Sequence, residues 1–328
     1  MRRYFLRRLL LALPTLLAVS FLTFAIIELP PGDYLDTKIA ELEQSLGDAS
    51  SRQQAAALRE KYGLDRPFLV RYGKWMAGMT HGDFGESFRY ERPVTDLLWE
   101  RLGWTLVVSG GSMLFVYFAA VPLGILMAAR RGAILDAGAN AMALLGLSVP
   151  GFLLALALLV TVFRISGLPL YGLFSAAYED APWSGARALD LFRHLLIPVA
   201  VIGMGGAGGL ARILRANMLD VLGEPFVRAA RARGLAERTV LLKHAARIAI
   251  NPLITMVGMS LPDILSGTTI VSIVLGLPTV GPLLYQALLD QDMYLAGTIL
   301  LFMAVLLVIG NLIADVGLAL ADPRIRHA

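Results

Sequence analysis

The sequence predicts an all-α polytopic membrane protein with six transmembrane helices. Of its 328 residues, 57% are hydrophobic, and the mean hydropathy is +0.66; soluble domains of this length rarely reach such values. Apolar runs of about 20 residues recur along the chain, and each is long enough to cross a bilayer as a helix. Basic residues cluster at the ends of these runs, where they set the orientation of the spans.

Six apolar runs are the predicted spans. The first follows a group of four arginines, so a secretory signal peptide is the alternative interpretation of that run. We expect a retained first helix instead, because the run is long enough to span and no small-x-small cleavage site follows it. The spans are predicted at residues 9–29, 104–129, 137–162, 195–214, 248–274 and 295–320.

The basic residues are consistent with a single orientation, with both termini in the cytoplasm. They gather at residues 2–8, 130–131, 212–247 and 324–326. The predicted organisation has four parts. They are the N-terminal cytoplasmic end with the first transmembrane helix (1–29), an extracytoplasmic segment (30–102), a five-helix core (103–320) with a cytoplasmic loop at 216–247, and a cytoplasmic C-terminal tail (321–328).

Residues 224–252 form the most polar and most basic segment between two long apolar runs. Phe226, Ala229 or Ala230, and Arg233 recur at helical spacing, which predicts a helix with one small apolar face and one charged face. Gly234 is expected to end that helix, and a second helical run follows it. A helix, a glycine turn and a second helix on the basic side of a membrane would make a knob for another protein. The alternative is an ordinary cytoplasmic loop.

This segment resembles the coupling loop in permease subunits of type I ABC importers, whose pattern is Glu-Ala-Ala, three residues, Gly. Ala229, Ala230 and Gly234 match the pattern, whereas Arg228 stands at the position of the glutamate. The peptide-transporter branch is more similar still. It typically has an Arg-x-Ala-Arg-Ala-x-Gly-Leu run followed by His-Ala-x-Arg, and this chain has Arg-Ala-Ala-Arg-Ala-Arg-Gly-Leu at 228–235 and His-Ala-Ala-Arg at 244–247.

Further landmarks extend the resemblance over nearly the whole chain. Those at 62–67, 81–87 and 92–94 are each compatible with plain turn chemistry, but their order and spacing together favour the family. The landmarks are Pro14-Thr15, Pro31-Gly32-Asp33, the Tyr-Gly-Leu-Asp-Arg-Pro run at 62–67, the runs at 81–87 and 92–94, the turn at 277–281, the element at 291–294 and the tail at 322–326. The resemblance implies a type I ABC importer permease fold, with 103–320 as the ABC type-1 transmembrane core, in a bacterial inner membrane.

The resemblance also implies a function and partners. It implies half of a translocation pathway for peptide-like solutes, a second homologous permease, two ABC ATPase subunits and an extracytoplasmic solute-binding protein. Oligosaccharides or other small solutes remain an alternative cargo. An ATP-independent carrier or channel is an alternative of a different class, which would predict inverted repeats and several mid-span charges. No clear repeat is visible.

We expect no cofactor in this chain and no catalysis by it, with ATP and Mg²⁺ bound by the partner subunits. The sequence has no Gly-x4-Gly-Lys-Ser/Thr loop, so usual ATP binding is not expected. Four histidines without metal-ligand spacing predict no metal site, and the absence of cysteine excludes disulfides and thiolate chemistry. The net charge of +4 does not indicate nucleic-acid binding, because the arginines follow the ends of the spans.

Two sets of candidate functional residues follow. The ATPase-coupling residues implied by the resemblance are Glu224, Phe226, Arg228, Ala229, Ala230, Arg231, Arg233, Gly234 and Leu235. The possible pathway residues are Pro150, Asp263 and Ser272. Pro150 would kink the third span, either as a packing feature or as a wall of the pathway.

Asp263 lies near the middle of the fifth predicted span. A carboxylate at that depth costs at least ~2.5 kcal/mol, which leaves three interpretations: pathway lining, structural hydrogen bonding, or ion coupling. Ser272 stands where the family often has a glutamate. In the fourth span, Gly203, Gly205, Gly206, Gly208 and Gly209 predict a close subunit or helix contact rather than a phosphate cradle, because no strand and no Lys-Ser/Thr flank them.

Overall fold

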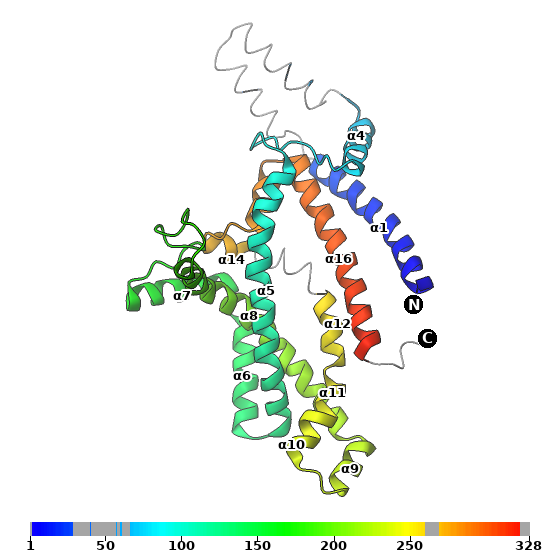
Figure 1. Ribbon diagram of the computed structural model, residues 1–328, viewed down its shortest axis with the longest axis vertical. Helices are drawn as coiled ribbons and strands as arrows, with labels where there is room; N and C mark the ends of the chain where they lie inside the picture. The colour runs from blue at the N-terminus through cyan, green and yellow to red at the C-terminus, as the bar shows by residue number, and fades with distance from the viewer. Residues whose placement is uncertain are drawn as a thin grey trace. The chain divides into compact units, whose positions relative to one another are not determined.

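The computed structural model describes residues 2–28, 40, 57, 60, 66–259 and 269–321, and most of these residues are in helices (Figure 1). The all-α prediction is confirmed for them; the extended structure among them is one β-bridge between Glu86 and Pro93. The helices are α1 Arg2–Glu28, α4 Phe68–Thr80, α5 Val94–Ala129, α6 Ile134–Ser148, α7 Gly151–Ser166, α8 Gly185–Leu222, α9 Pro225–Ala232, α10 Glu237–Thr239, the π-helix η1 Val240–Ala245, α11 Ala246–Ala249, α12 Asn251–Met259, α14 Thr269–Val274, α15 Val280–Leu289 and α16 Met293–Ala321.

Four of the described helices are long and apolar enough to cross a membrane: α1, α5, α8 and α16. A fifth span results if α6 and α7 are counted together. The predicted count of six stays a prediction, because the fifth predicted span (248–274) includes residues 260–268, which lie outside the described part of the chain.

The third predicted span is broken rather than kinked. Helices α6 and α7 meet at an angle of 100°, with Val149 extended (ψ 123°) and Pro150 capping α7. Proline has no amide hydrogen and pushes the preceding residue out of the helical region, so the break falls at this dipeptide. The single helix expected across 137–162 was therefore wrong in shape, although its proline was the correct point of disruption.

Two helices extend beyond the predicted spans. Helix α5 begins at Val94 rather than at 104, and α8 runs from Gly185 to Leu222 rather than from 195 to 214. The start of α8 is capped by Ser184, whose hydroxyl accepts a hydrogen bond from the amide of Arg187. Hydropathy marks only the part of a helix that suits lipid, whereas a cap marks where the helix begins.

The chain divides into two compact units. The first comprises residues 1–103 and 280–308. In it α4 packs on α1 through aromatic rings, with Phe24 fully buried against Phe68, Tyr72 and Trp75. The hydroxyls of Ser20 and Tyr72 lie 2.8 Å apart. These ring contacts hold α4 against α1.

The second unit comprises residues 104–279 and 309–328 and is built around α8. A β-carbon at Gly208 would lie 2.9 Å from the backbone of Ala143 on α6, and one at Gly203 would lie 2.4 Å from the Phe115 ring on α5. The close helix contact predicted for the glycine run is thus confirmed at these two positions. Gly209, by contrast, faces open space. Small residues on α8 therefore let α5 and α6 approach it closely.

Candidate functional site

Helix α9 is the short helix predicted after the fourth span. It follows α8 after Gly223 and begins with Pro225, a residue suited to the first helical position. Val227 and Ala230 lie on its buried side against Val240 of η1, with Val221 and Leu222 of α8 beside them. We call Val227, Ala230 and Val240 the anchor cluster. This cluster holds α9 at the end of α8; α9 itself is labelled in Figure 1.

The opposite side of α9 is exposed. Phe226 retains 39% of its surface, and Glu224, Arg228 and Ala229 are exposed with it. The predicted apolar face was therefore partly wrong, because Ala230 points inward whereas Phe226 and Ala229 point outward. The missed residue is Val227, and its spacing of three from Ala230 is the signal that would have identified the buried face.

Gly234 ends the helix as predicted. Its φ is +77°, a conformation that favours glycine. The amide of Leu235 donates to the carbonyl of Ala230 (3.4 Å), and the amide of Gly234 donates to the carbonyl of Arg231 (2.9 Å). These two bonds form a Schellman motif, which satisfies carbonyls that the end of a helix would otherwise leave unpaired. The result is a sharp turn with Leu235 exposed just beyond it.

An ion pair spans this turn. Arg231 on α9 reaches Glu237 at the start of α10, with Nη2–Oε1 at 2.6 Å and Nε–Oε2 at 3.1 Å. Both side chains are exposed, and the guanidinium lowers the pKa of the Glu237 carboxyl below its usual value. Arg231 thus has a partner within the chain, in addition to any role in docking.

The exposed surface around the turn is apolar at its centre and basic at its edge. Phe226, Ala229 and Leu235 supply the apolar atoms. Arg228 and Arg233 lie beside them, and the described residues provide neither with an ion pair. A small apolar patch with basic residues at its edge fits a groove whose rim is acidic, because the charges orient the partner while apolar burial stabilises the contact.

Comparison with known proteins shows which family has this architecture. Residues 120–327 match the model of the binding-protein-dependent transport system inner membrane component. Residues 1–109 match the model of the N-terminal part of such membrane components. The chain belongs to this family. It is a permease subunit of an ABC importer and a multi-pass inner membrane protein.

Full-length relatives support the assignment. The oligopeptide transport system permease protein AppB of Bacillus subtilis (strain 168) is 34% identical over 332 residues and covers 100% of both chains. The dipeptide transport system permease protein DppB of Escherichia coli (strain K12) is 32% identical over 345 residues, covering 100% of this chain and 99% of its own. A putative peptide permease protein of Brucella suis biovar 1 is 34% identical over 328 residues, with 99% of each chain covered.

Two of the possible pathway residues of this permease, Pro150 and Ser272, lie in the described part of the chain. Pro150 is exposed at the break between α6 and α7. Ser272 on α14 is fully buried, and its hydroxyl has no hydrogen-bond partner among the described residues. Helix α7 contacts α14 next to both, where a β-carbon on Gly151 would lie 3.4 Å from Val271. Asp263 lies outside the described residues.

Sequence reasoning missed a polar contact that joins α6 to α8 of the permease. Both oxygens of the buried Asp136 carboxylate accept hydrogen bonds from Arg215, each at 2.7 Å, and one also accepts from the amide of Gly132 at 2.9 Å. In the sequence, Asp136 is one acidic residue directly before the third predicted span. Asp136 can be recognised from the sequence as an acidic residue in the first turn of a helix. Its partner cannot, because Arg215 lies 79 positions away in the chain.

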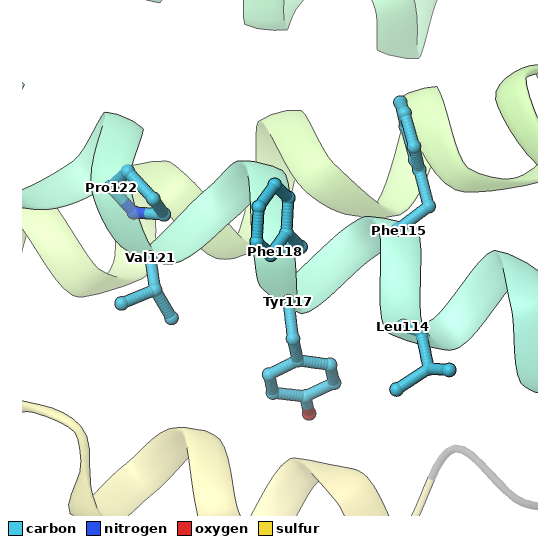
Figure 2. A pocket seen from close by; sticks show the side chains of 6 residues that line it. All are labelled: Leu114, Phe115, Tyr117, Phe118, Val121 and Pro122. Atoms are coloured by element: carbon cyan, nitrogen blue, oxygen red, sulfur yellow. The ribbon is translucent and has the colours of Figure 1, made fainter.

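A hollow of about 680 Å³ lies open along α5. Figure 2 shows its lining, which is Leu114, Phe115, Tyr117, Phe118, Val121 and Pro122. The Tyr117 hydroxyl donates to the carbonyl of Leu253 (3.1 Å). Because the lining is nearly all apolar, it suits lipid or another helix better than a polar solute.

Among the described residues, no group of three His, Cys, Asp or Glu side chains could hold a metal ion.

Proposed function

We propose that this permease forms half of a translocation pathway for peptide-like solutes and receives the work of ATP hydrolysis through α9. The observation that carries the coupling proposal is the two-sided character of α9: Val227 and Ala230 fix it to the permease, while Phe226 and Ala229 face outward. The proposed peptide cargo is supported by the printed names of the full-length relatives.

The coupling surface consists of Glu224, Phe226, Arg228, Ala229, Arg231, Arg233, Gly234 and Leu235, with Ala230 supporting it from below. Burial of a side chain the size of Phe226 contributes about 1.5–3 kcal/mol when it is complete. Ala229 leaves room for a groove wall to approach the helix, and the arginines orient the encounter more than they strengthen it. Closure of a partner on this helix would then reach the rest of the permease through the anchor cluster, which joins α9 to η1.

The proposed assembly contains a second homologous permease, two ABC ATPase subunits and an extracytoplasmic solute-binding protein, around chains embedded in the lipid bilayer. ATP and Mg²⁺ are assigned to the ATPase subunits, and this chain is non-catalytic. The absence of a phosphate-binding loop from the sequence supports this division. No nucleic-acid partner is proposed.

The proposed orientation has both termini in the cytoplasm, and the four-part organisation given above follows from it. The positive-inside rule supports it, because α9 and α10 carry several bases and residues 130–131 are both arginine. Pro150, Asp263 and Ser272 remain proposed pathway residues. Pro150 and Ser272 are favoured by their positions on either side of the α7–α14 contact.

The coupling proposal is tested by enlarging Ala229. In cells that depend on this transporter, Ala229→Trp should abolish uptake of a labelled dipeptide while the permease still copurifies with its partners or inserts at the normal level. Ala133→Trp is the matched control, because Ala133 is also exposed, in the turn before α6, and it should transport normally. Normal uptake by the Ala229 variant would overturn the role of α9.

Cargo and energy source need separate measurements. Unlabelled dipeptides should compete with uptake of the labelled dipeptide, whereas oligosaccharides should not; competition by oligosaccharides alone would replace the peptide assignment. Uptake into proteoliposomes should require the ATPase subunits and ATP. Solute movement by the permease alone would instead favour an ATP-independent carrier.

A further inference from the structure

A single turn of π-helix packs against α9, the proposed coupling helix. Residues Val240–Ala245 form η1 within a helical segment that begins at Glu237 and continues through α11. The amide of Ala246 donates to the carbonyl of Leu241, five residues back, instead of the four of an α-helix. Such turns are rare, and they occur frequently at functional sites.

The two ends of η1 belong to different packing clusters. Val240, at its start, is fully buried in the anchor cluster under α9. Ala245, at its end, is fully buried with Leu214 and Met218 of α8. Leu242 and Lys243, between them, are exposed. The π-helical turn therefore connects Val240, which packs against α9, to the packed helix that follows.

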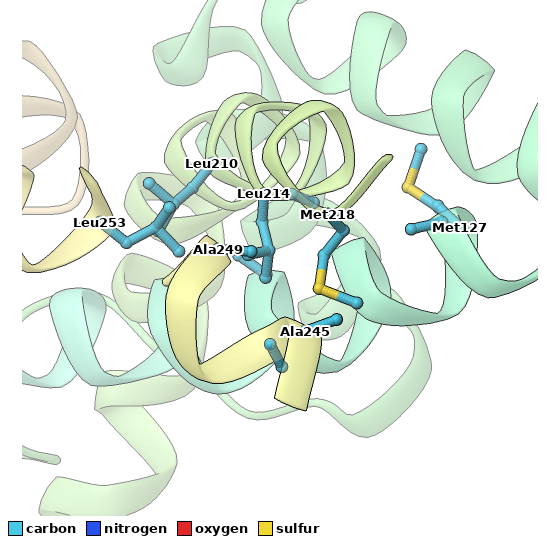
Figure 3. Close-up of a cluster of buried hydrophobic side chains, with 11 residues drawn as sticks. Met127, Leu210, Leu214, Met218, Ala245, Ala249 and Leu253 are labelled. Atoms are coloured by element: carbon cyan, nitrogen blue, oxygen red, sulfur yellow. The ribbon is translucent and has the colours of Figure 1, made fainter. Parts of the chain in front are cut away.

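The spacing of buried residues explains why this turn has to be wider. Ala245, Ala249 and Leu253 follow one another at steps of four and lie along the side of α8 that carries Leu210, Leu214 and Met218 (Figure 3). Val240 precedes Ala245 by five. In an α-helix, a step of five would turn the two side chains about 140° apart. A π turn brings residues five apart nearly into line, so both can be buried.

We propose that η1 is a hinge, which lets α9 move with an ATPase subunit while Ala245, Ala249 and Leu253 keep their contacts with α8. This inference rests on the proposed function of α9. Movement of Val240 with α9 would shift the extra residue along the helix and exchange an i→i+5 hydrogen bond for an i→i+4 bond. Because one backbone bond replaces another, no buried amide is left unpaired during the movement.

Deletion of Lys243 tests the hinge. In that variant Val240 and Ala245 would be four residues apart, so an ordinary α-helix would bury both at an offset of about 40°. The permease should therefore fold, insert and assemble with its partners. Uptake by the complete transporter should nevertheless fall about tenfold, within the range of 0.5–2 kcal/mol by which residues between sites alter coupling. Lys243→Ala, which keeps the chain length, is the matched control and should transport at the wild-type rate.

Normal uptake by the deletion variant would overturn the hinge. A second measurement keeps the chain at full length, so it stands even if the deletion prevents folding. The chain has no cysteine, so spin labels can be placed at Ala232→Cys on α9 and Arg247→Cys on α11. Both positions are exposed and they flank η1. In the complete transporter, the distance between the labels should change by several ångström when ATP binds; an unchanged distance would overturn the proposal.

These results separate the hinge from the coupling function on which it rests. If α9 receives no ATPase, Ala229→Trp transports normally, and both proposals fail. If α9 is the coupling helix but moves rigidly with α8, Ala229→Trp abolishes uptake, the Lys243 deletion transports normally and the label distance stays fixed. That combination overturns only the hinge.

Discussion

The hydroxyl of Ser87 donates a hydrogen bond to Oδ2 of Asp292 at 2.5 Å, although the two residues are 205 positions apart in the chain. Both side chains are fully buried. The same carboxylate accepts from the amide of Leu295 (3.1 Å), so it caps the start of α16, and from the amide of Arg89 (3.3 Å). One carboxylate therefore ties the segment before α5 to the start of the last helix.

Removal of the Ser87 hydroxyl should destabilise the permease. A hydrogen bond to a buried charged group contributes about 1.5–3 kcal/mol, so Ser87→Ala should lower the free energy of unfolding by about 2 kcal/mol. Thermal unfolding of the detergent-solubilised chain measures this. Ser112→Ala is the control, because the buried Ser112 hydroxyl donates only to the carbonyl one turn back; it should have a smaller effect. Equal effects in the two variants would contradict the role of Asp292.

The stability of this contact should also depend on pH. Burial raises the pKa of the Asp292 carboxyl despite the hydrogen bonds from Ser87 and three backbone amides. The folded state therefore holds the proton more tightly than the unfolded state. The stability contribution is full below the ordinary pKa of about 3.9 and declines as the pH rises through the raised value.

Asp292→Asn should remove that decline. The melting temperature of this variant relative to wild type should rise as the pH increases from about 4, since asparagine does not titrate. A difference that is constant with pH would show that Asp292 titrates at its ordinary value in the folded permease.

The sequence was sufficient to predict the helical class and the motif at α9, for reasons that are local. Apolar runs locate α1, α5, α8 and α16, and the Gly234 turn follows from a glycine placed at the end of a helical pattern. Each of these depends on residues within a few turns of one another. Pro150 likewise showed where a helix would be disrupted.

Features set by packing between distant segments were not predictable from single positions. The 100° angle between α6 and α7 depends on how both helices pack, which Pro150 alone does not specify. The Ser87–Asp292 bond joins residues 205 positions apart. In the sequence, the π-helical turn is visible only as the spacing of five residues between Val240 and Ala245. That spacing predicts a π turn only when both residues are known to be buried.

Any side chain at Gly234 should destabilise the turn. An alanine at φ +77° is strained by about 1–2 kcal/mol, even though no neighbouring atom lies within 4 Å of its β-carbon. Gly234→Ala should lower both the melting temperature and uptake. Gly73→Ala is the matched control, because Gly73 is exposed within α4 with equally open space; it should stabilise by up to about 1 kcal/mol. A neutral result at Gly234 would mean that the turn relaxes to another conformation.

Charge reversal at the Arg231–Glu237 ion pair distinguishes two roles for Arg231: positioning α9 within the chain, or contacting an ATPase subunit. Arg231→Glu would place two carboxylates across the Gly234 turn, and uptake should fall by at most about fivefold, because exposed ion pairs contribute about 1 kcal/mol or less. The reversed pair, Arg231→Glu with Glu237→Arg, keeps the attraction and should restore the initial rate of dipeptide uptake.

Restoration shows that the pair positions α9, since the reversed arginine lies on α10 and not on the coupling helix. The loss in the single variant should also shrink at high ionic strength, because exposed charges are screened. If the reversed pair transports as poorly as Arg231→Glu alone, the guanidinium at 231 is needed by an ATPase subunit. Glu237 would then pair with Arg231 only while the permease is not bound to an ATPase subunit.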